Sequence, residues 1–158
     1  MDYKIIVRTH KREKLAAHMT LRVLAEQTDI DLEKCLYLNI NSDEIPAYEK
    51  VLRNVPHAGV ISCQKKGGHH SINTTTDFFP EGERLVFMDD DTMKMWEWHH
   101  GTTAAKSTRQ MQCLGRYLTD AFQTLEAGHA KAFHMYCMPN AFYKKGKPFK
   151  EVRPHLLG

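Results

Sequence analysis

Three consecutive carboxylates, Asp89, Asp90 and Asp91, directly follow the uncharged apolar segment at residues 85–88. Adjacent anions repel one another, and aspartate has low helix and strand propensity, so nothing structural is gained by gathering them where a buried strand meets a loop. A divalent cation would remove this penalty, and carboxylate oxygens suit Mg²⁺ or Mn²⁺, which keep coordination positions open for phosphate oxygens. The run therefore predicts a metal site. The alternative is an acidic solvated turn, or an aspartate capping a helix that begins near Thr92.

Strands and helices are expected to alternate along the chain. Short apolar, often β-branched segments predict strands at residues 4–7, 35–38, 59–63, 85–88 and 130–138. Apolar residues at helical spacing, with turn residues at the ends, predict helices at residues 13–27, 45–52, 71–79 and 103–128. This order predicts an α/β fold, a mostly parallel twisted sheet with helices on both faces. Ligands of such sheets bind beyond the carboxyl ends of the strands, where the polar loops of this chain fall.

Length and composition set the remaining bounds. A chain of 158 residues with 42% hydrophobic residues can bury one core, so we expect a single domain over residues 1–158. The net charge of +3 permits a nucleic-acid or phosphate partner without arguing for one. The four cysteines form no CxxC pair, which argues against a zinc knuckle or a redox motif and favours buried thiols. No apolar stretch approaches ~20 residues and the first residues are charged, so we expect a cytoplasmic protein with no membrane partner.

The order of the polar loops resembles the nucleotide-sugar-binding half of GT-A fold glycosyltransferases. A basic loop at residues 8–12 follows the first strand, an Asn- and Asp-rich loop at residues 39–43 follows the second, and a glycine-containing helix start at residues 64–70 precedes the acidic run. The resemblance covers about residues 3 to 95. In that family the acidic run, the DxD motif, binds Mn²⁺ or Mg²⁺ and the diphosphate of a sugar nucleotide. The resemblance thus implies Asp89 and Asp91 as metal ligands, Asp90 at the nucleotide, and a UDP-sugar as donor.

Six further site residues follow from the same resemblance, by position alone. It implies Thr9 and Arg12 near the nucleotide, and Asn41 or Asp43 near the base. Lys66 and His69 would lie near the ribose or phosphate. Arg12 is the strongest of these candidates, because a guanidinium can hold a phosphate with two hydrogen bonds or stack on a base. For each residue the alternative is a solvated loop position.

The aromatic and histidine-rich stretch after the acidic run offers additional candidates. One of His99 and His100 is expected to face the site, the alternative being two surface histidines. Trp96 and Trp98 could stack on a sugar or a base, although packing is the commoner role of tryptophan. No catalytic base is identified. Glu97 and Asp120, which lies in a predicted helix, are the candidates, but either could equally be an ordinary surface charge. Inverting and retaining chemistry both stay open.

A narrower resemblance is to the phage (TET-associated) glycosyltransferases that modify hydroxymethylated pyrimidines in DNA. The segments IIVRTHKRE and PNAFYKKGKPF carry it. It implies DNA as acceptor and the host cytoplasm as location. The basic residues of the tail could then neutralise DNA phosphates, although an ordinary solvated surface explains them equally well: Lys144, Lys145, Lys147, Lys150 and Arg153. GT-A enzymes usually carry a larger acceptor-binding half, so we expect a fragment, a split gene product or a site completed by oligomerisation.

Three other functions are compatible with the same residues. A metal-dependent phosphodiesterase or nuclease would use the acidic run with His99 or His100 to bind ions and activate water. A non-catalytic nucleotide- or DNA-binding module would bind the ligand and transfer nothing. A nucleotidyltransferase would share the strand order and the acidic metal site.

Overall fold

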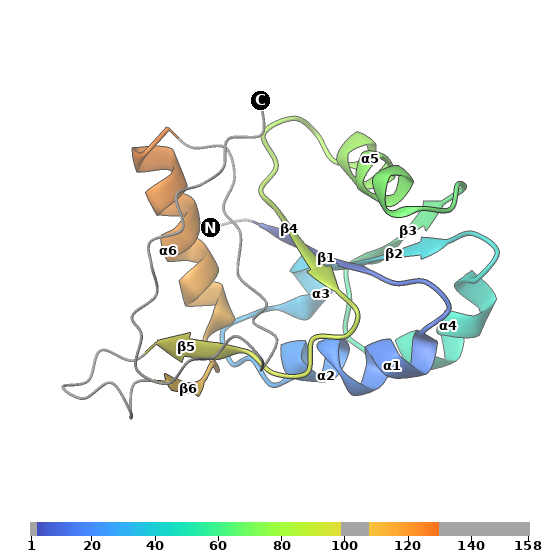
Figure 1. Cartoon of the computed structure of the whole chain (residues 1–158), viewed down its shortest axis with the longest axis horizontal. Coiled ribbons are helices and arrows are strands. Elements are labelled where there is room, and N and C mark those ends of the chain that lie inside the picture. Colours follow the sequence, from blue (N-terminus) through green and yellow to red (C-terminus); the bar gives the residue numbers. More distant parts are fainter. Residues whose placement is uncertain (1–2, 99–107, 130–158) are drawn as a thin grey trace, which may run out of the picture.

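The computed structural model describes residues 3–98 and 108–129, and its centre is a four-stranded parallel sheet (Figure 1). Its strands, in the spatial order β3-β2-β1-β4, are β1 Lys4–Arg8, β2 Leu36–Asn41, β3 Gly59–Cys63 and β4 Leu85–Asp89. In the centre of the sheet Val7 is in register with Leu38 and with Met88. The predicted α/β class and parallel sheet are confirmed, and the strand order is that of the first four strands of a Rossmann-like sheet.

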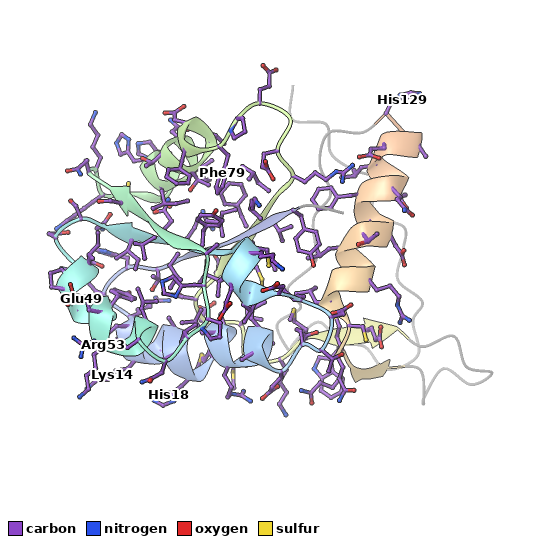
Figure 2. All side chains as sticks on the ribbon, turned by 180° about the vertical axis from the view of Figure 1, so that it is seen from behind. Lys14, His18, Glu49, Arg53, Phe79 and His129 are labelled. Carbon is purple, nitrogen blue, oxygen red and sulfur yellow. The ribbon has the colours of Figure 1, made fainter. Side chains whose placement is uncertain are left out.

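Helices cover both faces of this sheet, as predicted (Figure 1). On one face lie α1 Glu13–His18, α2 Thr20–Ala25 and α4 Ile45–Leu52, over fully buried strand residues such as Ile5 and Leu38. Seen from behind, Lys14 and His18 of α1 and Glu49 of α4 lie on the outer side of this layer (Figure 2). The other face carries α5 Gly68–Phe78, which packs against β2 and β3. Strand side chains on both faces of the sheet are therefore buried, most completely in the central strands β1 and β2.

A second group of elements flanks the amino ends of the strands. Helix α6 Leu114–Ala127 lies there, and the ring of Phe122 stacks on Tyr3 with centroids 6.5 Å apart. Two carboxylate oxygens of Asp29 accept hydrogen bonds from the first backbone amides of α6, those of Gly115 and Arg116. A separate antiparallel pair, β5 Trp96–Trp98 with β6 Thr108–Gln110, connects β4 to this helix.

The predicted helix at residues 13–27 is two helices. The backbone leaves helical geometry at Met19, with φ −112° and ψ −96°, before α2 begins at Thr20. Thr20 is fully buried, and its hydroxyl donates to the carbonyl of Asp89 and accepts from the amide of Thr92. This attachment to the loop after β4 is a tertiary contact that helical periodicity does not reveal, and it accompanies the break.

Three further boundaries also differ from the sequence-based expectation. Cys35 ends a short helix, α3 Leu32–Cys35, and β2 continues to Asn41, so residues 39–41 belong to a strand and not to a loop. No helix begins near Thr92: residues 92–95 form no regular structure, and the Thr92 amide bonds to the hydroxyl of Thr20. The helix predicted from residue 103 begins at Leu114, since residues 108–110 pair with β5 and the amide of Met111 bonds to the carbonyl of Met95.

Some predictions concern residues outside the described ranges. These are the strand at residues 130–138, His99 and His100, Cys137 and the basic residues between 144 and 153. Of the other cysteines, Cys35 and Cys63 are buried free thiols, as predicted, and Cys113 is partly exposed. Among the described helices, none combines the length and the apolar character needed to cross a membrane.

Candidate functional site

All of the predicted nucleotide-site residues lie at one edge of the sheet. Because the four strands are parallel, the segments that follow them meet at the carboxyl edge, which Figure 1 shows at the tip of β4 and beside the start of α1. From β3 across to β4, these segments carry Lys66 and His69, Asn41 and Asp43, Thr9 and Arg12, and Asp89, Asp90 and Asp91. The order reverses between β1 and β4, where the crossovers leave in opposite directions, and this is the place at which such sheets form a ligand crevice.

The three aspartates of the acidic run occupy different environments. Asp89 ends β4, its side chain is 66% exposed, and its Oδ1 lies 2.6 Å from Nη2 of Arg8 on the neighbouring strand. Asp90 is buried, with 5% of the residue exposed. The side chain of Asp91 is 57% exposed. Asp89 and Asp91 therefore present carboxylates to solvent, whereas Asp90 is held inside the protein.

Asp90 terminates a directed chain of buried hydrogen bonds. The hydroxyl of Thr9 donates to Oδ2 of Asp90 at 2.8 Å and lies 2.7 Å from the hydroxyl of Tyr48. Since the Thr9 proton is used on Asp90, the Tyr48 hydroxyl donates to Thr9, and it accepts in turn from the backbone amide of Arg12 at 3.1 Å. Burial raises the pKa of Tyr48, which keeps this phenol protonated and able to donate. The chain fixes Asp90 and the start of the loop after β1.

Two guanidinium groups compensate the acidic run. Arg12 Nη1 lies 3.3 Å from Oδ1 of Asp90 and 3.6 Å from Oδ2 of Asp91, and Arg8 pairs with Asp89. Three carboxylates thus face two guanidinium groups within the same cluster. The repulsion from which a metal site was predicted is therefore relieved in large part by the protein itself, and one net negative charge is left for an external cation.

A second buried carboxylate, Glu44, shapes the loop after β1. Its oxygens accept the backbone amide of Lys11 at 2.8 Å and the side-chain amide of Asn41 at 3.3 Å, and they lie 2.5 Å from Nδ1 of His10. Lys11 has a φ of 53°, a conformation that is uncommon for a residue with a side chain, and the Glu44 bond holds its amide in place. Asn41, predicted near the base, is thus part of a network that fixes the loop between β1 and α1.

The residues predicted near the ribose or phosphate lie at the β3 end of the same edge. Lys66 Nζ is 3.0 Å from Oδ2 of Asp43, and its hydrogen bond lowers the pKa of that carboxyl. His69 is in the first turn of α5, where its ring centroid lies 3.9 Å from that of His70. Desolvation, followed by the charge of His69, lowers the pKa of His70. Lys66 is therefore engaged with Asp43 in this structure, and both side chains are exposed enough to exchange partners.

The described residues offer only part of the coordination shell of a divalent cation, and water or a bound phosphate would complete it. They contain no group of three or more His, Cys, Asp or Glu side chains placed to hold a metal ion. Asp89 and Asp91 nevertheless offer two exposed carboxylates two residues apart. Mg²⁺ and Mn²⁺ commonly bind one or two carboxylates and take their other ligands from phosphates and water. The donor set therefore suits a metal that arrives with a diphosphate.

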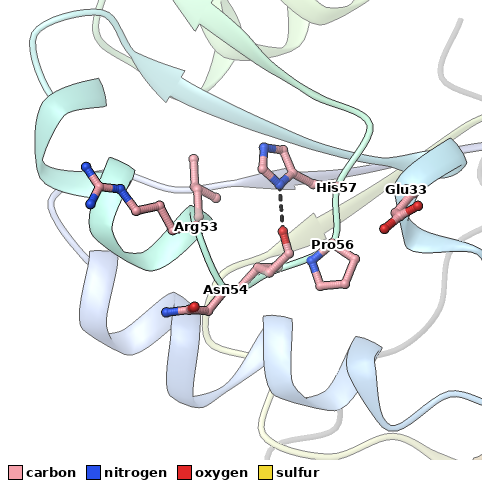
Figure 3. A pocket seen from close by; sticks show the side chains of 7 residues that line it. Glu33, Arg53, Asn54, Pro56 and His57 are labelled. Carbon is pink, nitrogen blue, oxygen red and sulfur yellow. Dashed lines mark hydrogen bonds between the residues drawn. The ribbon is translucent and has the colours of Figure 1, made fainter.

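Two shallow hollows of the described surface lie at the other edge of the sheet. One is a shallow depression lined by residues 52–57 and Glu33, in which Nδ1 of His57 bonds to the carbonyl of Val55 at 2.7 Å (Figure 3). Arg53 and Glu33 lie on either side of it. Because residues 53–57 lead into β3, this hollow is at the amino ends of the strands, and no predicted site residue lines it.

Sequence reasoning missed four residues that organise the site. Arg8, Glu44, Tyr48 and Thr20 make long-range contacts to the acidic run or to the loop after β1. Arg8 belongs to the basic loop at residues 8–12, but its residue type alone suggests no partner for it. Tyr48 and Thr20 lie in predicted helices, where a polar group on a buried face could have suggested a buried partner.

Comparison with known proteins gives limited information. No family model matches the chain, and no curated protein matches it. A search of solved structures finds a crystal structure of S. aureus TarS, a glycosyltransferase, with 19% identity and a TM-score of 0.46. The alignment covers 91% of this chain and 24% of the TarS chain. The chain thus matches about a quarter of that protein, and a similarity of this size assigns no activity.

Proposed function

We propose that this chain is the nucleotide-sugar-binding domain of a GT-A-like glycosyltransferase that binds its donor with Mn²⁺ or Mg²⁺. The observation that carries the proposal is the arrangement of the acidic run. Two exposed carboxylates, Asp89 and Asp91, flank a buried and fixed Asp90 at the point of a β3-β2-β1-β4 sheet where the strand order reverses. The guanidinium of Arg12 lies beside them. Anionic and cationic groups at a switch point match a ligand that combines a metal and a diphosphate.

Each group has a distinct task in this proposal. Asp91, and Asp89 with it, would hold the cation, which supplies positive charge where the departing nucleoside diphosphate develops negative charge. Arg12 would hold a phosphate oxygen through charge-assisted hydrogen bonds. Asp90, predicted at the nucleotide, is buried, and in this proposal it would act by aligning the loop after β1 through Thr9. Lys66 and Asn41 would meet the nucleoside end, further along the same edge.

The first test measures donor binding together with its metal requirement. Binding of UDP-glucose, UDP and other sugar nucleotides is measured by calorimetry with Mn²⁺ or with EDTA, for the wild type and for Asp91→Asn. Because Asp91 is the less engaged of the two exposed carboxylates, its loss should weaken metal-dependent binding by at least tenfold. Asp120→Asn, an exposed aspartate in α6 at the far edge, is the matched control and should bind like the wild type.

The same samples separate the competing functions. Release of UDP in the presence of an acceptor supports glycosyl transfer, and hydroxymethylated DNA is the acceptor that the sequence resemblance proposes. Cleavage of DNA or of a phosphodiester without any sugar nucleotide would identify a nuclease. Metal-dependent binding without turnover, with water and varied acceptors present, would identify a binding module. Failure of every nucleotide to bind to the folded wild type would refute the proposal.

A further inference from the structure

Arg8 and Asp89 form a direct ion pair at the carboxyl edge. They are register partners on the adjacent strands β1 and β4, and Nη2 of Arg8 lies 2.6 Å from Oδ1 of Asp89. Neighbouring register partners in a parallel pair point to the same side of the sheet, so the pair forms without any loop rearrangement. The Arg8 side chain is 29% exposed and that of Asp89 is 66% exposed. The geometry of the sheet therefore pairs Arg8 with Asp89, one of the two carboxylates that are proposed to bind the metal.

The guanidinium of Arg8 uses only part of its hydrogen-bonding capacity within the protein. Its Nε is buried and has no hydrogen-bond partner within the described part of the chain. A buried donor without an acceptor is destabilising, and a guanidinium offers a second edge, Nε with one Nη, that matches two oxygens of a phosphate. Asp89 therefore occupies only part of the hydrogen-bonding capacity of Arg8. A phosphate ligand would satisfy more of it.

We propose that Arg8 is the resident counter-cation of Asp89 and is exchanged when ligand binds. Asp89 releases the guanidinium and takes the divalent cation, because a second cation beside an arginine on the same carboxylate is repelled. The released Arg8 then hydrogen-bonds the phosphate groups of the nucleoside diphosphate. The exchange keeps the acidic run neutralised in both states. This inference rests on the proposed function, and it adds Arg8 as a residue that tunes metal affinity and contacts the phosphates.

The metal half of the exchange is tested with Mn²⁺ alone. Electron paramagnetic resonance of free Mn²⁺ gives its dissociation constant for the wild type and for Arg8→Met, which removes the charge and keeps an unbranched apolar side chain. Removing one positive charge from the neighbourhood of a divalent ion should tighten Mn²⁺ binding about tenfold. Asp89→Asn in the Arg8→Met background should abolish the gain, because it removes the proposed ligand.

Arg84→Met is the matched control for these titrations. Arg84 precedes β4, its side chain is also 29% exposed, and it pairs with Glu126 at the opposite edge of the sheet. It should bind Mn²⁺ like the wild type. An Arg8→Met protein that binds Mn²⁺ no more tightly than the wild type, or a gain of equal size in Arg84→Met, overturns the exchange.

The phosphate half is tested with UDP at saturating Mn²⁺. Arg8→Met should bind UDP at least tenfold more weakly even though it binds the metal more tightly. A purely structural role of Arg8 would not change the two affinities in opposite directions. Arg8→Lys, which keeps the charge and loses the two-pronged geometry, should retain the wild-type Mn²⁺ affinity and bind UDP more weakly. Unchanged UDP binding in both variants overturns the phosphate contact. If the wild type binds no nucleotide, the proposed function fails. The Mn²⁺ titration still decides whether Arg8 competes with a divalent cation for Asp89.

Discussion

The hydroxyl of Tyr48 offers the sharpest test of how the acidic run is positioned. Tyr48 is fully buried, and its hydroxyl links the backbone of Arg12 to the side chain of Thr9, which in turn holds Asp90. Tyr48→Phe removes this one oxygen and keeps the ring that packs in the core. It deletes a hydrogen bond of 2.7 Å and one of 3.1 Å. At about 1 kcal/mol for each bond, with the Arg12 amide left without its acceptor, we expect the free energy of unfolding to fall by about 2 kcal/mol.

Urea denaturation followed by circular dichroism measures this loss. The midpoint should fall at an unchanged slope, and the melting temperature should drop by about 6 °C for a chain of this size. Tyr37→Phe is the matched control, because the Tyr37 ring packs edge-on against Phe78 and Phe79 and its hydroxyl has no hydrogen bond within the described residues. The control should change the free energy of unfolding by less than about 0.5 kcal/mol.

A double-mutant cycle with Thr9→Val isolates the contact itself. If the Tyr48 hydroxyl donates to Thr9, the two substitutions should show a coupling energy of about 1 kcal/mol. A loss below about 0.5 kcal/mol for Tyr48→Phe, or strictly additive effects with Thr9→Val, would refute the directed chain from Arg12 to Asp90. Asp90 would then be held by Thr9 and Arg12 without support from Tyr48.

Three further predictions concern the fold. Burial raises the pKa of Tyr3 to about 12 and that of Cys35 to about 11, so between about pH 9 and pH 12 the unfolded chain loses protons that the folded chain keeps. Stability should therefore fall with rising pH in this window, and Tyr3→Phe should flatten the upper part of the slope in denaturation curves taken at a series of pH values. Asp29→Ala removes the carboxylate that caps α6 and should cost about 1–2 kcal/mol by chemical denaturation; an unchanged midpoint would show that the cap contributes nothing. Gly115→Ala would put a Cβ 2.5 Å from the carbonyl of Asp29 and should lower the stability by about 1–3 kcal/mol, whereas Gly68→Ala, with no atom within 4 Å, should be neutral or slightly stabilising; equal midpoints for the two variants would contradict the close approach at α6.

Much of the sheet could be predicted because its signals are local. The apolar, β-branched segments gave β1, β3 and β4 to within a residue, and α4 is predicted with its observed bounds, Ile45–Leu52. The boundaries that differ depend on contacts between distant segments. Thr20 is fixed by the loop after β4, and the start of α6 is fixed by Asp29, 86 residues away from Gly115 in the sequence. No window of neighbouring residues contains that information.

The sequence by itself determined which chemistry the carboxyl edge could hold. Parallel strands bring their following loops together whatever the side chains are, so the predicted Thr9, Arg12, Asn41, Lys66 and the acidic run had to meet there. Only the tertiary structure decided how the three aspartates differ. In the sequence the three aspartates are adjacent and indistinguishable. In the structure, strand register pairs Asp89 with Arg8, and a hydrogen bond from Thr9, which Tyr48 supports, fixes the buried Asp90. Asp91 stays exposed and makes the weakest contacts of the three. Burial and pairing are properties of neighbours in space, and for this site those neighbours lie 36 to 81 residues away in the sequence.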